Sequence, residues 1–174
     1  MLQFAMDKNI ALVGFMGSGK TTVAFSLAKK LERKLVSTDD IIVRKEQCSI
    51  TDIFALKGEK YFRSLEKDIV AQLSQEKNIV VDCGGGIVLQ EDNILNLKKN
   101  GIIVYLKASV DVLHTRTQNE THRPLLNVSD PKAKIKELFL KREPFYTKAD
   151  YTIDTSEKSV SEVVDAITQL LKNA

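Results

Sequence analysis

The strongest constraint on this chain is a short loop at residues 14–21, which read GFMGSGKT and match the pattern G-x-x-x-x-G-K-[ST]. Residues 9–15, which lead into this loop, are mostly apolar and predict a buried strand. Apolar residues at helical spacing follow from Lys20 and predict a helix. A glycine-rich loop between a strand and a helix turns its backbone N–H groups inward, and the helix N-terminus adds partial positive charge. The sequence therefore predicts a binding loop for the phosphates of a nucleoside triphosphate.

The same motif predicts which side chains hold the nucleotide. Lys20 is expected to reach the β- and γ-phosphates, and the Thr21 hydroxyl is expected to hold Mg²⁺. The motif does not say what the nucleotide is used for. A GTPase would carry an Asn-Lys-x-Asp segment, which the sequence lacks, and a motor or transporter ATPase normally needs a chain longer than 174 residues. The nucleotide-binding residues expected from the loop are Gly17, Ser18, Gly19, Lys20, Thr21 and Thr22.

Short apolar segments alternate with helical patterns along the whole chain. The expected strands are residues 9–15, 34–37, 78–83, 101–106 and 151–154. The expected helices begin at Lys20 and then cover 49–73 with a break near Gly58, 91–99, 110–117 and 131–146. A last helix starts with a capping box, Ser159 to Glu162, and is expected to bury Val160, Val163, Val164, Ile167 and Leu171. This alternation predicts an α/β fold, a parallel sheet with helices on both faces, and a single domain over residues 1–174.

Glycine is concentrated at two places. Of the eight glycines, six lie in two clusters: Gly14, Gly17 and Gly19, then Gly84, Gly85 and Gly86. Each cluster follows an expected strand. Because ligands of parallel α/β sheets bind beyond the carboxyl ends of the strands, both clusters should open onto the same crevice.

Composition narrows the remaining possibilities. Lys and Arg number 26 and Asp and Glu 23, a net charge of +3 that does not favour a nucleic-acid partner. No segment approaches the roughly 18 apolar residues of a membrane span, so no membrane partner is expected. The two cysteines, Cys48 and Cys83, lack metal-ligand or redox spacing, which favours a reducing compartment. We expect a cytoplasmic monomer.

Arginine is rarer than lysine in this chain, with six arginines against twenty lysines. The planar guanidinium of arginine can donate two parallel hydrogen bonds to one carboxylate or phosphate, which the ammonium of lysine cannot do. Arg33 and Arg44 lie among other charges and are expected to be solvated. The other four, Arg63, Arg116, Arg123 and Arg142, lie in distinctive local sequences and are candidates for binding residues.

In these arginines and the motifs around them, the chain resembles the shikimate kinases, a family of the nucleoside-monophosphate-kinase-like P-loop group. The resemblance rests on GFMGSGKTT, an acidic segment after the second strand, SITDIF, the GE..FR..E stretch, GGG, RPLL and R.P.Y. It implies a three-layer α/β/α fold with five parallel strands in the order 2-3-1-4-5. It also implies transfer of the γ-phosphoryl group of ATP, with Mg²⁺, to the 3-hydroxyl of shikimate, and a lid at about residues 118–130.

The resemblance also assigns an acceptor site, with a shikimate-binding region at about residues 37–66. Asp39 resembles the aspartate that hydrogen-bonds the shikimate hydroxyls, and is the candidate base or orienting group for the attacking oxygen. Arg63 and Arg142 resemble the two arginines that grip the substrate carboxylate. The substrate-binding glycine turn corresponds to Gly84, Gly85 and Gly86, with Gly85 most directly placed.

Two further arginines are assigned to the nucleotide by the same resemblance. Arg123 resembles the lid arginine that reaches the phosphates and stabilises the transferring charge, so that Lys20, Asp39 and Arg123 are the expected catalytic residues. Arg116 resembles the arginine that packs on the adenine, which the loop after Asp154 is also expected to border.

One position departs from the family pattern. The family usually carries Asp-x-Asp after the second strand, and the first aspartate helps to hold Mg²⁺, whereas this chain has Ser37 before Asp39. A hydroxyl is a weaker partner for Mg²⁺ than a carboxylate. A shifted alignment would use Asp40 in place of Asp39, but the ten-residue step from Asp39 to Ser49 matches the family spacing and argues against that shift. We hypothesise that Asp82, at the end of the third expected strand, takes over this role; the alternative is that Asp82 caps the glycine turn or faces solvent.

Two other functions remain open from the sequence. One is a kinase of the same fold with another acceptor, such as gluconate or a nucleoside monophosphate. The paired arginines and the acidic hydroxyl acceptor suit a carboxylated polyol better than a second nucleotide. The other is a nucleotide-binding regulatory module that has lost catalysis, which Ser37 favours slightly and the retained Lys20, Asp39 and arginines disfavour.

Overall fold

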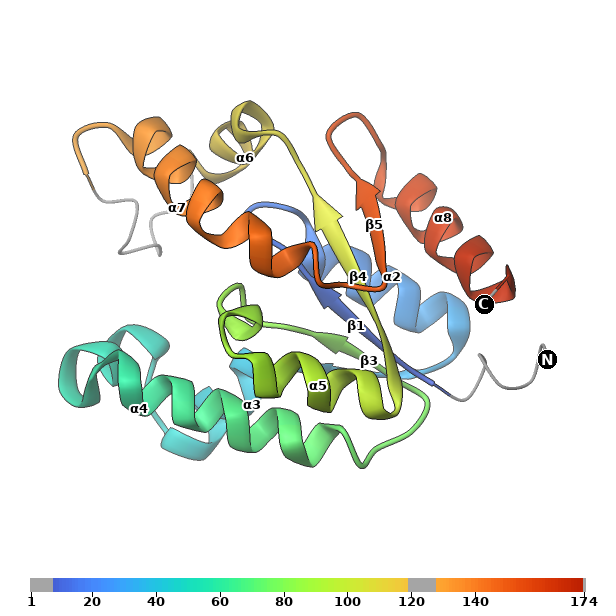
Figure 1. Cartoon of the computed structure of the whole chain (residues 1–174), viewed down its shortest axis with the longest axis horizontal. Helices are drawn as coiled ribbons and strands as arrows, with labels where there is room; N and C mark the ends of the chain where they lie inside the picture. The colour runs from blue at the N-terminus through green and yellow to red at the C-terminus, as the bar shows by residue number, and fades with distance from the viewer. Residues whose placement is uncertain (1–7, 119–127, 174) are drawn as a thin grey trace.

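The computed structural model describes residues 8–118 and 128–173 of the chain. Its centre is a parallel five-stranded sheet in the order β2-β3-β1-β4-β5 (Figure 1). This confirms the expected fold class and strand order. The strands are β1 Asn9–Val13, β2 Lys34–Ser37, β3 Ile79–Asp82, β4 Gly101–Lys107 and β5 Tyr151–Asp154.

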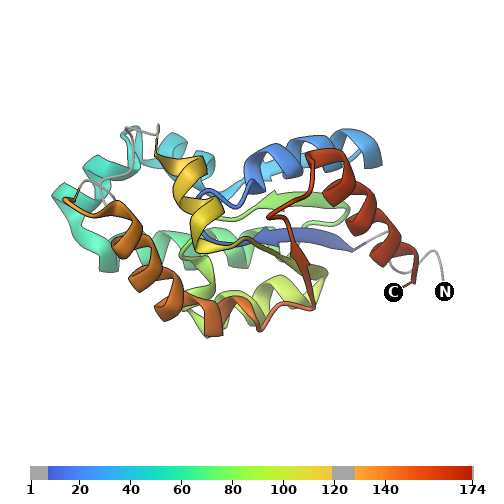
Figure 2. The same ribbon diagram turned by 90° about the horizontal axis from the view of Figure 1, so that it is seen from above.

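Alternate residues of the central strands enter two separate apolar cores, one on each face of the sheet. On one face Ile10 and Leu12 of β1 pack with helices α2 (Lys20–Leu31) and α8 (Val160–Asn173). On the other face Ala11 and Val13 pack with α4 (Ile50–Leu73), α5 (Glu91–Lys99) and α7 (Pro131–Tyr146). Figure 2 shows the sheet between these helical layers. Strands that are buried on both faces explain why β1, β3 and β4 read as continuous apolar runs.

The second face carries the helices that reach the carboxyl edge of the sheet. They are α4 Ile50–Leu73, the 3₁₀ turn Ile87–Leu89, α5 Glu91–Lys99 and α7 Pro131–Tyr146, joined by α6 Val110–Thr117. Helix α4 is kinked at Gly58, whose φ of 79° and ψ of 168° are non-helical, as the sequence predicts. No helix among the described residues is long and apolar enough to cross a membrane.

The structure adds one helix that the sequence analysis does not predict. Helix α3 spans Thr38–Glu46, directly after β2, and packs against α4. Ser37 is its N-cap, because the Ser37 Oγ accepts a hydrogen bond from the backbone N–H of Asp40 at 3.2 Å. The helix places Asp39 in its first turn, at the carboxyl edge of the sheet.

The last helix begins as predicted, with one exception. The Ser159 N–H donates to Glu162 Oε2 at 2.8 Å, and the Glu162 N–H donates to Ser159 Oγ at 3.3 Å, which is the expected capping box. Val163, Val164, Ile167 and Leu171 are buried as predicted. The prediction for Val160 is wrong: it is 36% exposed, because it lies in the first turn, beyond the residues that contact the core.

Candidate active site

A pocket of about 860 Å³ opens at the carboxyl ends of β1, β2 and β3. It brings together most of the residues predicted from the sequence, although they come from distant segments. The predicted residues that line it are Gly17, Gly19, Lys20, Thr21, Thr22, Asp39, Arg63, Asp82, Gly84, Gly85, Gly86, Arg116 and Arg142. Both glycine clusters therefore open onto one crevice, as the topology predicts.

Two predicted residues are not part of this lining. Ser18 is 1% exposed, and its backbone N–H donates to the Phe15 carbonyl at 3.1 Å. A Cβ on Gly14 would lie only 2.7 Å from the Ser18 hydroxyl. The buried Ser18 side chain therefore packs against Gly14 and supports the loop from the protein interior. Arg123 and most of the predicted lid at 118–130 lie outside the described residues.

The loop between β1 and α2 is suited to an anion. Gly17 has a φ of 80°, and a Cβ there would lie 2.7 Å from the Thr117 methyl group, so the position requires glycine. The first turn of α2 contains no acidic residue to compete for its N–H groups. The Lys20 ammonium donates to the Phe15 carbonyl at 3.1 Å, which keeps it beside the loop. This end of the pocket therefore concentrates N–H donors and positive charge.

Arg116 joins the loop that follows β5 to this end of the pocket. One Arg116 nitrogen, Nη2, donates to the Thr155 carbonyl at 2.9 Å, and the other, Nη1, donates to the Thr155 hydroxyl at 3.3 Å. The Thr155 hydroxyl in turn donates to the Lys107 carbonyl at 3.1 Å. Arg116 is thus held between the phosphate loop and the loop after Asp154, which the resemblance assigns to the adenine.

The triple-glycine turn after β3 lacks side chains because charged groups occupy the adjoining space. A Cβ on Gly84 would lie 2.5 Å from Asp39 Oδ1, and a Cβ on Gly86 would overlap the Arg63 guanidinium. The Gly84 N–H donates to the Thr38 hydroxyl at 2.8 Å, which fixes the start of the turn. The turn therefore sets the positions of Asp39 and Arg63 as well as its own backbone.

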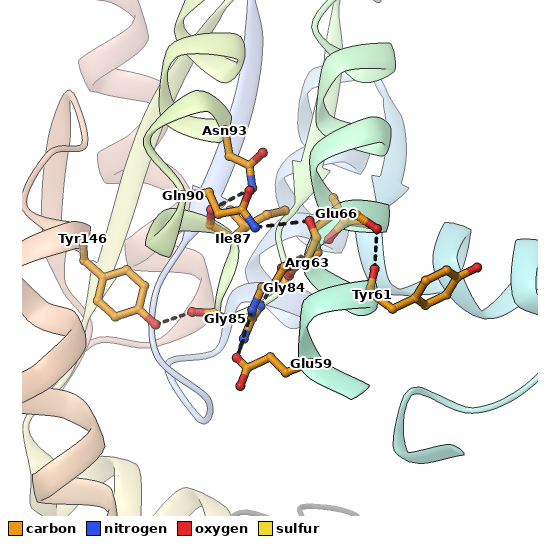
Figure 3. Close-up of polar contacts among 12 residues, drawn as sticks. Glu59, Tyr61, Arg63, Glu66, Gly84, Gly85, Ile87, Gln90, Asn93 and Tyr146 are labelled. Atoms are coloured by element: carbon orange, nitrogen blue, oxygen red, sulfur yellow. Dashed lines mark hydrogen bonds and ion pairs between the residues drawn. The ribbon is translucent and has the colours of Figure 1, made fainter. Parts of the chain in front are cut away.

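Arg63 is oriented by two glutamates of its own helix (Figure 3). Its Nη2 lies 2.9 Å from Glu59 Oε1 and its Nη1 lies 2.5 Å from Glu66 Oε2. Glu59 is exposed, whereas Glu66 is only 1% exposed. The guanidinium is therefore held at the pocket wall with its plane against Gly86, where it can receive an anionic group.

Glu66 is a site residue to which the sequence analysis assigns no role. Burial raises its pKa to about 7, against the opposing effect of Arg63. Its Oε1 and Asp39 Oδ1 are buried and have no hydrogen-bond partner among the described residues, and both lie close to Gly84. A sequence signal was available, because Glu66 is four residues after Phe62 and so interrupts the apolar face of α4.

Asp39 and Asp82 both line the pocket with Lys20, whose charge acts on each of them. Burial raises the pKa of Asp39, and Lys20 lowers it. Asp82 is only 7% exposed, and it lines the pocket together with Thr21 rather than lying on the outer surface. The first N–H of the glycine turn is bound by Thr38 rather than by Asp82. Among the described residues no group of three or more His, Cys, Asp or Glu side chains is arranged to hold a metal ion.

Tyr146 holds the glycine turn in place. Its hydroxyl donates to the Gly85 carbonyl at 2.5 Å (Figure 3). Burial raises the pKa of the same hydroxyl, and the positive charge of Arg142 acts against this larger effect. The ring stacks on Tyr105 with centroids 5.0 Å apart and an interplanar angle of 14°. In the sequence this tyrosine stands out only as part of R.P.Y. Its buried position lets the hydroxyl fix a backbone carbonyl of the glycine turn at the wall of the pocket.

The raised pKa of Glu66 predicts a pH-dependent stability. Between about pH 4.5 and 7 the unfolded chain has lost this proton while the folded chain retains it, so the free energy of unfolding falls as pH rises. The Glu66→Gln variant lacks this titration. Its free energy of unfolding, relative to the parent, should therefore rise by up to about 3 kcal/mol from pH 4.5 to pH 8, measured by urea unfolding.

The matched control is Glu59→Gln, which removes the exposed partner of the same arginine. It should leave the pH dependence of the parent almost unchanged, because its carboxylate stays in water. Equal slopes for Glu66→Gln and the parent would contradict the prediction.

A family model described as shikimate kinase matches residues 16–172. A shikimate kinase of Caldanaerobacter subterraneus subsp. tengcongensis is 46% identical over 160 residues, covering 92% of this chain and 94% of the relative. A relative of the same name from Thermodesulfovibrio yellowstonii is 43% identical over 160 residues, covering 92% of each chain.

Solved structures agree with this match. A shikimate kinase from Acinetobacter baumannii in complex with shikimate superposes with a TM-score of 0.90 at 39% identity, covering 97% of this chain and 95% of that one. The shikimate kinase of Aquifex aeolicus superposes with a TM-score of 0.80 at 35% identity, covering 95% and 96%. With the phosphate loop, the glycine turn and the arginines in one pocket, this chain belongs to the shikimate kinase family.

Proposed function

We propose that this protein is an active shikimate kinase, which transfers the γ-phosphoryl group of ATP to the 3-hydroxyl of shikimate and so supplies a step of chorismate and aromatic amino acid biosynthesis. The products are shikimate 3-phosphate and ADP. The observation that carries the proposal is that one pocket has a phosphate loop at one end and Asp39, Arg63 and Arg142 at the other. Membership of the family supports the same conclusion.

The nucleotide end is proposed to bind ATP through backbone donors and a few cations. The N–H groups of the loop and the N-terminus of α2 face the phosphates, with Lys20 at the β- and γ-phosphates. Arg116 and the loop that holds it border the adenine. Arg123, in the proposed lid, would stabilise the negative charge that is transferred. Lid closure would exclude water and so limit hydrolysis of ATP.

The donor set fits Mg²⁺, which kinases of this type use with ATP. Mg²⁺ prefers hard oxygen ligands, keeps several waters, and takes one or two protein groups in addition to phosphate oxygens. The Thr21 hydroxyl and a buried carboxylate lie together at the phosphate end of the pocket. When bound there, Mg²⁺ would neutralise charge between the β- and γ-phosphates.

The acceptor end matches a small polyol with one carboxylate. Arg63 and Arg142 would bind the carboxylate, and the backbone of Gly84 to Gly86 would lie against the ring. Asp39 would accept a hydrogen bond from the 3-hydroxyl and take its proton as the hydroxyl oxygen bonds to the γ-phosphorus. The bond from that phosphorus to the bridging oxygen breaks, and ADP leaves with the electron pair. No covalent enzyme intermediate is needed.

We also propose how the chain is organised and where it works. Residues 1–174 form a single kinase domain, with the acceptor region at about 37–66. Cys48 and Cys83 are both free thiols, which fits a reducing cytoplasm. We propose a monomer whose partners are ATP and shikimate, without a nucleic-acid or membrane partner.

A coupled assay for ADP release tests the function directly. With ATP and Mg²⁺, ADP release should depend on added shikimate, and gluconate or nucleoside monophosphates should not replace it. Turnover with gluconate or a nucleoside monophosphate but not with shikimate would favour a related kinase. Nucleotide binding without turnover on any acceptor would favour a regulatory module.

Loss of one carboxylate-binding arginine separates the two ends of the pocket. Arg63→Ala should raise the KM for shikimate about tenfold to a hundredfold, because charge-assisted hydrogen bonds are lost. The affinity for ADP, measured by calorimetry, should stay near that of the parent and serves as the test of folding. Arg44→Ala, an exposed arginine outside the pocket, is the control and should change neither value. An unchanged KM for shikimate in Arg63→Ala would argue against the assigned role.

Removal of the Tyr146 hydroxyl tests whether it positions the acceptor site. Tyr146→Phe keeps the stacked ring but loses the hydrogen bond to the Gly85 carbonyl. The KM for shikimate should rise several-fold while the KM for ATP stays constant, since only the acceptor wall is affected. Tyr151→Phe, on the edge strand β5, is the control. A parallel change in both KM values would indicate a general structural effect instead.

A further inference from the structure

We propose that Asp82, at the end of β3, supplies the protein carboxylate of the Mg²⁺ site in this chain, in place of the aspartate that the family pattern puts at position 37. The carboxylate binds the ion or one of its waters, next to the Thr21 hydroxyl. The inference rests on the proposed use of ATP with Mg²⁺. It concerns whether the carboxylate near the metal ion comes from the end of β2, at position 37, or from the end of β3, at position 82.

The sheet register places the two strand ends side by side. Ser37 of β2 and Asp82 of β3 are paired residues, and on the other side of β3 Asp82 is paired with Leu12 of β1. Strand β1 leads directly into the phosphate loop, and Figure 1 shows β1 next to β3. Asp82 therefore lies one strand closer to the phosphate loop than Ser37. A carboxylate moved from position 37 to position 82 remains at the same edge.

The surroundings of Asp82 are those of a ligand rather than of a structural ion pair. The side chain is 7% exposed, yet no salt bridge within 4.0 Å is found for it among the described residues. It lines the same pocket as Thr21 and Lys20, and both of these residues act on it electrostatically. Both belong to the phosphate loop. A buried carboxylate is costly unless charge compensates it, and a divalent cation beside Thr21 would provide that charge.

The two neighbouring aspartates are placed for other purposes. Asp40 is exposed, and its backbone N–H is bound by the Ser37 hydroxyl. Asp39 is directed toward Gly84 and Glu66, at the acceptor end of the pocket. The Ser37 hydroxyl is engaged as the N-cap of α3, a role that aspartate fills equally well. Helix capping therefore does not require serine at position 37, and an aspartate there would face the Asp82 carboxylate across the paired strands.

The exchange can be tested by moving the carboxylate back. ADP binding is measured by titration calorimetry, without shikimate, once in EDTA and once in excess Mg²⁺. In the parent, Mg²⁺ should strengthen ADP binding. In Asp82→Asn this gain should fall about tenfold or more, as when other metal-site partners are removed, while the affinity in EDTA is kept or slightly improved. The double variant Ser37→Asp with Asp82→Ser should recover most of the gain.

Asp40→Asn is the matched control, because it removes one nearby negative charge that is exposed. It should keep the Mg²⁺ gain of the parent. The affinity in EDTA shows that each variant is folded, and since shikimate is absent the result does not depend on turnover. A full Mg²⁺ gain in Asp82→Asn overturns the proposal, and so does a double variant that fails to recover the gain. Failure of the parent to turn over shikimate would instead count against the proposed function alone.

Discussion

The site depends on the parallel register of β2, β3 and β1, which ends all three strands at one edge of the sheet. In a parallel sheet the segments that follow neighbouring strands must leave from the same side, so they compete for one space. The phosphate loop follows β1, helix α3 follows β2, and the glycine turn follows β3. The turn fits between the other two because it has no side chains: Asp39 fills the space beside Gly84, and Arg63 fills the space beside Gly86.

The same edge holds several buried charged groups whose hydrogen bonds or charges a bound ligand could satisfy. Glu66 is paired with Arg63 and still has a raised pKa, and Asp39 has a buried oxygen without a partner among the described residues. Such groups destabilise an empty site and favour a ligand that brings hydroxyl donors, a carboxylate or a cation. In the proposed function, the end with Asp39, Arg63 and Arg142 would take a polyol acid, and the end with the phosphate loop would take phosphate with its metal ion. The distribution of charge would then divide one pocket between two substrates.

Several local features could be predicted from sequence because they depend on near neighbours. The kink at Gly58 and the capping box at Ser159 follow from backbone freedom and from a hydrogen bond three residues away. Helix α3 could not be predicted from the sequence pattern, because its three consecutive apolar residues, 41–43, do not repeat at helical spacing. The helix is stabilised instead by its N-cap and by packing on α4. Val160 has the correct spacing, but spacing defines a face of the helix and not how far the core extends along it.

The alternation of strands and helices, the phosphate loop and the residues that carry the family resemblance can all be read from the amino-acid sequence, because these are properties of short segments. How those segments meet became visible in the folded chain. Folding placed Glu66 against Arg63, directed Tyr146 to the Gly85 carbonyl, and paired Ser37 with Asp82 across two strands. The physical reason is that register, depth of burial and contact between distant side chains arise from packing of the whole sheet and its helices, which no local pattern contains.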